Sequence, residues 1–147
     1  MNRGQIIMNL RPLRRVLVVA AEAVISKAFE SNDEDERPPS KSQFSQLVNL
    51  CGEATCGAEI ENYLRYQAGR GAAGSVSKRE AWKVSFVKEV VASISKILPK
   101  TSLGSTEEER DLHQVEAWRL YATYMARAFT YEDAIRREAT RNAGGRR

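Results

Sequence analysis

Aromatic and basic side chains are grouped in the middle of this sequence, a combination of residue types that can contact a phosphate backbone. Tyr66 and Arg70 are four residues apart, so they share one face of a predicted helix. A glycine-rich stretch follows, and Lys78, Arg79 and Lys83 come after it, at the predicted start of the next helix. Glycine lets a backbone approach a phosphate closely, and a helix N-terminus presents free amide donors. The pattern leaves two interpretations open: these cations bind an anionic backbone, or their stems only cover the edge of the core.

Catalytic and metal-binding patterns are not found in the sequence. The single histidine, His113, lies three residues from Arg110 and Glu116 on a predicted helix surface, without a nucleophile at a workable spacing. Cys51 and Cys56 are interpreted as reduced core residues, and with one histidine they cannot assemble a zinc site. We therefore expect no enzyme activity, no cofactor and no bound metal.

The formal net charge of +4 conceals a strong segregation along the chain. Residues 30–36 hold five acids and no base, whereas residues 37–100 hold ten basic and five acidic side chains. A cationic middle of this kind favours a polyanionic partner. The densest apolar run, residues 16–25, is shorter than the roughly 18 residues of a membrane span and contains Glu22. We expect a cytoplasmic protein with reduced cysteines and no membrane contact.

Apolar side chains recur every three or four residues along most of the chain, and alternating strand patterns are almost absent. Three Ser-x-x-Glu/Gln capping boxes precede apolar runs, and they begin at Ser40, Ser77 and Ser105. Trp82 and Trp118 each lead an apolar stripe, so both are expected in the core. The helices expected after the first cover about residues 41–52, 57–68 and 78–98, and the last starts near residue 106. The predicted fold is all-α, a compact antiparallel bundle of about five helices.

The predicted organisation separates an N-terminal helix from the main bundle. The expected parts are an N-terminal helix (1–30), an acidic linker (31–39), the bundle (40–141) and a flexible basic tail (142–147). The linker acids repel one another and Pro38 with Pro39 cannot continue a helix, so we expect a solvated, mobile segment. Gly69, Gly71 and Gly74 are expected to break the third helix and leave a flexible loop.

The last predicted helix is apolar on two faces. One stripe runs from Val115 to Phe129, and Leu120, Tyr124 and Tyr131 lie on another face. Such a helix is either central in its own core or in contact with another protein. The second interpretation makes Leu120, Tyr124 and Tyr131 candidate protein-contact residues.

Three short segments occur in a recognisable order. Residues 40–47 read S-K-S-Q-F-S-Q-L, residues 63–70 read Y-L-R-Y-Q-A-G-R, and residues 118–129 form an aromatic-rich stretch. In order and spacing they resemble the S-Q-x-R-x-L opening, the L-x-Y-x-A-G-R element and the closing helix of the Csm-type small subunit of type III CRISPR effector complexes. The resemblance covers roughly residues 40–131, and Ser45 stands where the family tends to have arginine or another polar residue.

The resemblance implies a non-catalytic, all-helical subunit of an antiviral ribonucleoprotein. Its partners would be guide RNA and target RNA, the backbone and large subunits, and further copies of itself stacked as an inner filament. The family pattern points to Arg70, with Tyr66 positioning it and Arg65 beside them, whereas Lys78, Arg79 and Lys83 come from the charge pattern. Alternatives are the small subunit of Cmr-type complexes and a stand-alone helical nucleic-acid-binding regulator.

Overall fold

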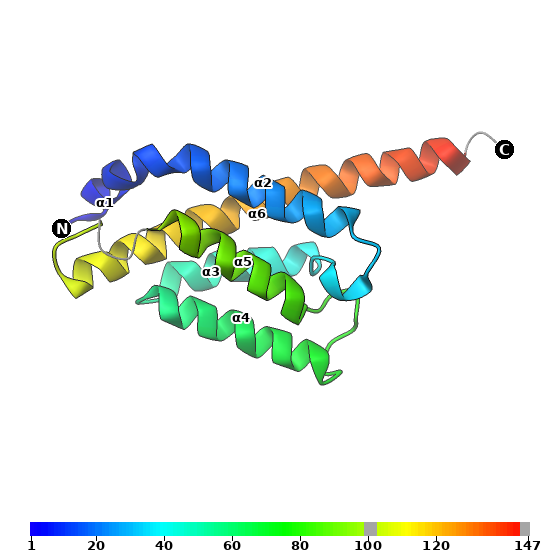
Figure 1. Cartoon of the computed structure of the whole chain (residues 1–147), viewed down its shortest axis with the longest axis horizontal. Coiled ribbons are helices and arrows are strands. Elements are labelled where there is room, and N and C mark those ends of the chain that lie inside the picture. Colours follow the sequence, from blue (N-terminus) through cyan, green and yellow to red (C-terminus); the bar gives the residue numbers. More distant parts are fainter. Residues whose placement is uncertain (99–102, 145–147) are drawn as a thin grey trace.

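The computed structural model describes residues 1–98 and 103–144, and every regular element in these ranges is helical (Figure 1). The all-α prediction is therefore confirmed. The six α-helices and two 3₁₀ turns are α1 (Arg3–Leu10), η1 (Arg11–Leu13), α2 (Arg14–Glu30), η2 (Glu34–Glu36), α3 (Lys41–Glu53), α4 (Gly57–Ala72), α5 (Val84–Ile97) and α6 (Glu107–Gly144). None of the described helices is both long and apolar enough to cross a bilayer.

Helix α6 is the central element of the bundle. It runs the length of the molecule, and its C-terminal part projects beyond the other helices (Figure 1). Helices α2 and α3 make the most extensive contacts with it, and α1 and α4 also touch it. Its predicted stripe is buried at Trp118, Ala122, Met125 and Phe129, and Val115 is partly buried. Leu120, predicted as a possible protein contact, instead lies in the core of this chain, because it is only 7% exposed.

An aromatic cluster joins three helices and the segment before α5. Phe44 of α3 packs edge-on against Trp82, with ring centroids 5.4 Å apart, and its ring also contacts Phe86 and Phe129. Trp82 is 1% exposed and Trp118 is 2% exposed, which confirms the prediction that both lie in the core. Aromatic pairs in such geometries contribute beyond the area that they bury.

The predicted capping box at Ser77 is wrong, because α5 begins only at Val84 with Lys83 as its N-cap. The Ser77 carbonyl accepts hydrogen bonds from the amides of Glu80 and Ala81, which makes a single turn. The backbone then becomes extended, with ψ of 144° at Lys83. This break carries the Trp82 side chain into the core, and burial of a large aromatic outweighs the few helical hydrogen bonds that are not formed.

The predicted break of α4 at its glycines is also wrong. The helix continues through Gly69 and Gly71 to Ala72, and the left-handed residue that follows is Gly74, with φ of 81°. At Gly71 a Cβ atom would lie 2.8 Å from the carbonyl oxygen of Trp82 and 2.9 Å from the Cβ of Ala81. Gly71 therefore permits close packing of the segment before α5, not a flexible loop.

The predicted capping boxes at Ser40 and Ser105 mark the starts of α3 and α6 correctly, but neither serine makes the predicted capping hydrogen bond. Ser40 is the N-cap of α3, yet its side chain makes no capping hydrogen bond. Helix α6 starts at Glu107, and the hydroxyl that accepts from a first-turn amide is that of Thr106, 3.1 Å from the nitrogen of Glu109.

Residues 1–30 form two helices with a 3₁₀ turn around Pro12 between them, and they share the core of the rest of the chain. His113, predicted on a helix surface, is fully buried beneath α1. Its Nδ1 donates to the Glu109 carbonyl oxygen at 2.7 Å, and its Nε2 lies 3.0 Å from Nδ2 of Asn9. The surface assignment fails because the sequence pattern does not reveal α1 as a helix that packs on α6.

The linker contains the 3₁₀ turn η2, and the predicted tail is partly helical. Residues 32–37 are exposed, as expected of a solvated segment, whereas Pro39 is buried. The Ser31 hydroxyl donates to the Glu36 carboxylate at 2.6 Å.

At the other end of the chain α6 continues to Gly144, so residues 142–144 are helical, and the rest of the predicted tail lies outside the described residues.

Replacing Trp82 or Trp118 by alanine should lower the free energy of unfolding by about 3–5 kcal/mol, because each substitution leaves a large cavity. Urea denaturation followed by circular dichroism measures the change. Val84→Ala is the control, since Val84 is 45% exposed. A change below about 1 kcal/mol at either tryptophan would contradict its place in the core.

Gly71→Ala should destabilise the protein, whereas Gly69→Ala should stabilise it by roughly 0.5–1 kcal/mol through helix propensity. The two positions lie on the same helix, but a Cβ at Gly69 meets nothing within 4 Å. Thermal melting of both variants compares them directly. Equal stabilisation by both substitutions would show that the contact at Gly71 is not as close as described.

Backbone amides of residues 31–37 should exchange with deuterium orders of magnitude faster than those of α3, because exposed acids followed by two prolines leave little to hold this segment. Hydrogen exchange measured by mass spectrometry tests this. Protection on the scale of the helices would mean that the linker is as ordered as the bundle.

Candidate nucleic-acid interface

A groove of about 800 Å³ lies where three segments far apart in the sequence meet. One wall is the linker, a second is the segment before α5, and the third is the part of α6 from Phe129 to Thr140. In Figure 1 this is the end of the bundle over which α6 projects. The basic residues that line it are Arg37, Lys78, Arg79, Lys83 and Arg136, and the acidic one is Glu34. These five basic residues define the cationic groove.

The turn that carries Lys78 and Arg79 is held from both sides. Trp82 anchors it to the aromatic cluster, and Gly71 allows its backbone to lie against α4. The backbone amide of Ser40 donates to the carbonyl of Glu80 at 3.5 Å, which ties the linker to the same turn. The two cations are therefore held on a fixed backbone although both side chains are exposed.

Lys83 differs from its two neighbours because it is partly buried. Its Nζ donates to the carbonyl oxygen of Lys78, across the turn. Lys78 and Lys83 also line an adjoining hollow of about 380 Å³ with Ala68, Gly71 and Ala72 of α4. The groove thus extends toward the C-terminal end of α4.

Arg136 enters the groove from α6, and the sequence pattern does not identify it. Its guanidinium lies over the ring of Phe29, 5.3 Å from the centroid, and its Nη2 is 3.5 Å from the Glu132 carboxylate. Its Nε is buried and has no hydrogen-bond partner among the described residues. Arg37 is likewise absent from the predicted site residues. Arg37 is next to Pro38 and Pro39 in the sequence, and all three line the groove. No local sequence pattern connects Arg136 with residues 78–83.

The predicted residues of α4 form a separate group. The guanidinium of Arg70 lies 5.9 Å from the centroid of the Tyr66 ring, which is 61% exposed, and Arg65 is also exposed. The predicted Tyr66–Arg70 pairing is therefore present as a cation–π contact. Neither residue lines the cationic groove, so the structure divides the predicted RNA-binding residues into two groups.

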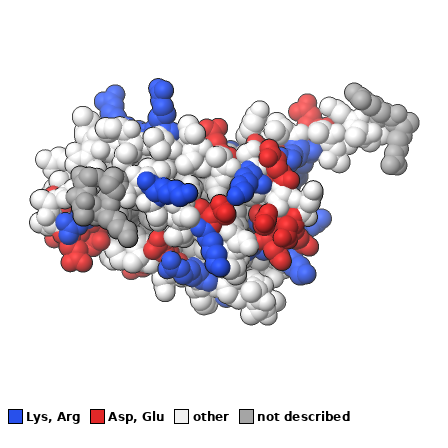
Figure 2. All heavy atoms as spheres, in the orientation of Figure 1, with Lys and Arg blue, Asp and Glu red and all other residues white. Residues whose placement is uncertain are grey.

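The charge segregation seen along the sequence does not make one uniform face. Figure 2 shows basic and acidic side chains interspersed over the face that it presents. Basic side chains outnumber acidic ones locally, in the groove, and this local excess is what an anion would encounter.

The three predicted protein-contact residues differ in how far their side chains are buried. Leu120 belongs to the core, Tyr124 is partly buried and Tyr131 is 65% exposed. Tyr124 and Tyr131 line a hollow of about 310 Å³ between α2 and α6, together with Val18 and Glu22. Tyr131 is the one of the three with a largely exposed side chain.

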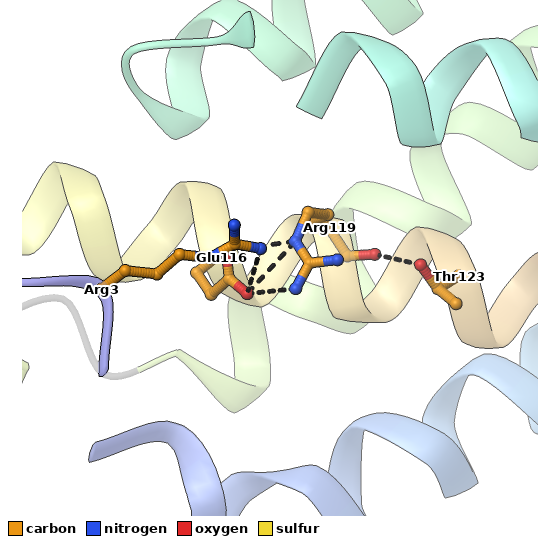
Figure 3. A network of polar contacts seen from close by, with 4 residues as sticks. All are labelled: Arg3, Glu116, Arg119 and Thr123. Carbon is orange, nitrogen blue, oxygen red and sulfur yellow. Dashed lines mark hydrogen bonds and ion pairs between the residues drawn. The ribbon is translucent and has the colours of Figure 1, made fainter. Parts of the chain in front are cut away.

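A network of polar contacts on α6 satisfies a buried carboxylate (Figure 3). Glu116 is 8% exposed, and both of its oxygens accept from Nε of Arg119 at 3.1 Å. Arg119 Nη2 also contacts Glu116, Arg3 Nη2 lies 4.0 Å away, and the Thr123 hydroxyl donates to the Arg119 carbonyl at 2.8 Å. The hydrogen bond to Glu116 raises the pKa of Arg119. Arg119 neutralises the buried Glu116 carboxylate, and loss of Arg119 alone would leave an uncompensated buried charge.

The buried thiol and phenol nearby are held in their neutral forms. Burial raises the pKa of the Cys51 thiol to about 12, and burial raises the pKa of Tyr121 to about 12, although Tyr121 donates to Ser93 at 2.9 Å. A thiol with such a pKa is not a nucleophile at neutral pH. Within the described ranges no three His, Cys, Asp or Glu side chains gather as a metal site would require.

Comparison of this chain with protein-family models, with curated proteins and with solved structures gives no match.

Proposed function

We propose that this chain is a non-catalytic, RNA-facing subunit of a ribonucleoprotein, of the kind represented by the small subunit of type III CRISPR effector complexes. The observation that carries the proposal is the convergence of basic side chains from three distant segments in the cationic groove. The segments that resemble the family support it, since they lie on α3, α4 and α6.

The chemistry of the groove suits a phosphate backbone more than a base edge. Lys78 and Arg79 are exposed on a fixed turn and have no carboxylate within 4 Å among the described residues, so their charges are available to an anion. Phosphate contacts position a protein on a nucleic acid without reading its sequence. In a guide-bearing complex, base pairing between guide and target would supply the sequence specificity.

The Tyr66–Arg70 pair of α4 provides a second contact in this proposal. The ring holds the guanidinium by a cation–π interaction, and the exposed face of Tyr66 is able to stack on an unpaired base. Copies stacked along the guide–target duplex would each present one cationic groove and one Tyr66–Arg70 pair. A-form RNA suits such recognition because it is bound mainly through shape and backbone.

Reversal of two groove charges, Lys78→Glu with Arg79→Glu, should weaken incorporation of the chain into a reconstituted RNA-loaded type III complex. The same change should reduce the slope of log K against log salt by about 0.7–0.9 for each phosphate that the variant no longer neutralises. Native gels at several salt concentrations measure both effects, and Arg65→Glu with Arg70→Glu tests the α4 group separately. The melting temperature of both variants should change little, because Arg65, Lys78 and Arg79 are exposed and Arg70 is partly exposed.

The matched control is Lys88→Glu with Arg141→Glu, which changes the net charge equally at two exposed positions that line neither the cationic groove nor the groove between α2 and α5. An equal weakening in the control would mean that net charge alone matters. An unchanged salt slope in both test variants would move the RNA-facing surface to Arg11, Arg14 and Arg15. Tight binding of the isolated chain to duplex DNA of arbitrary sequence, with no affinity for backbone subunits, would instead identify a stand-alone regulator.

A further inference from the structure

Helix α2 is apolar on nearly all sides, although only one side faces the core. Its inward stripe includes Leu17, Ala21 and Ile25, all fully buried. Val16 and Val19 point the other way and are 48% and 59% exposed. A helix that is apolar all round is normally covered on every side. The outer face of α2 therefore has the composition of a contact surface.

The exposed face of α2 forms a groove together with α5, against which α2 packs. The groove has a volume of about 630 Å³. Val16, Val19, Ala20 and Ala23 of α2 line one side, and Ala92 and Ile97 are among the residues on the other. Small residues along both helices leave room for a third helix to lie between them, as in helix-in-groove recognition.

The rim of this groove is positively charged. Arg15 lies at one end of the α2 side, Lys27 at the other, and Lys96 on α5. Glu89 is the acidic lining residue, and its carboxylate is 3.5 Å from Nζ of Lys27, so that pair is already neutralised. Arg15 and Lys96 make no ion pair within the described residues. An apolar floor between these two cations is complementary to a helix with an apolar face and acidic flanks.

We propose that the α2–α5 groove docks an amphipathic, acidic helix of a partner protein. Leucine-sized side chains of that helix would bury Val16 and Val19, and its flanking carboxylates would meet Arg15 and Lys96. A phosphate backbone would leave the valines uncovered, and a basic helix would be repelled by the rim. The proposal does not depend on RNA binding, because the groove shares no lining residue with the cationic groove.

The test uses the full chain and a fluorescent synthetic peptide of about five helical turns, ~18 residues, with leucine and alanine on one face and glutamate on both flanks. A second peptide has lysine in place of every glutamate. Fluorescence anisotropy should show that the glutamate peptide binds about tenfold or more tightly than the lysine peptide. Arg15→Glu with Lys96→Glu should reverse this preference, because the rim then repels acids.

Val19→Glu should weaken binding of the glutamate peptide by about tenfold or more, since a charge would replace the apolar floor. Met8→Glu is the matched control, because Met8 is 61% exposed and lies outside the groove. Circular dichroism should show both variants folded, as neither side chain is buried. Lys78→Glu with Arg79→Glu should leave peptide binding unchanged, which separates this proposal from the RNA-facing function.

The proposal is overturned if neither peptide binds, if both bind equally, or if Val19→Glu has no more effect than Met8→Glu. It is also overturned if the chain self-associates with increasing concentration and Val19→Glu abolishes this association while the glutamate peptide does not compete. In that case a second copy of the chain, not an acidic partner helix, covers the groove.

Discussion

Burial of Trp82 is the interaction on which the cationic groove depends. The indole packs edge-on against Phe44 and stacks on Phe86, with its centroid 6.0 Å away. To place this side chain in the core, the backbone leaves its helical turn at Ala81 and begins α5 three residues later. Lys78 and Arg79 consequently lie on a turn at the edge of the groove and not in the first turn of a longer helix. Gly71 makes this arrangement possible, because a side chain there would meet the Trp82 carbonyl.

Helix α6 gives the bundle its single core, and its interior polar groups are compensated. His113 is hydrogen-bonded between the Glu109 carbonyl and Asn9, and Glu116 is neutralised by Arg119. A buried polar group without a partner costs on the order of 1–3 kcal/mol, so these contacts offset a penalty that burial of His113 and Glu116 would otherwise carry. The projecting end of α6 serves a different purpose, since Arg136 brings a cation into the groove from the far end of the chain.

The two proposed surfaces differ in the physics by which they would bind. The cationic groove has dispersed charge and one apolar ring under a guanidinium, an arrangement suited to a backbone of phosphates and sensitive to salt. The α2–α5 groove has an apolar floor and charges only at its rim, so most of its binding energy would come from burial, with charge selecting the partner.

The sequence alone predicts the fold class, the approximate positions of most helices, and the burial of Trp82, Trp118 and Phe129. These follow from apolar periodicity, which is a local property and persists in the folded chain. It also placed Lys78, Arg79 and Lys83 next to one another, because they are neighbours along the chain.

Where the helices end and which distant residues meet depend on how the helices pack together. The capping box at Ser77 was a valid local signal, but burial of the next aromatic side chain overrode it. The glycines of α4 correctly indicated a special backbone requirement. At Gly71, however, that requirement is close contact with Ala81 and Trp82, ten and eleven positions later, and not chain flexibility. Arg136 and Arg79 line the same groove although 57 positions separate them in the sequence. His113 is buried by α1, at the other end of the chain. Such contacts depend on how the helices pack on α6, and no local pattern contains that information.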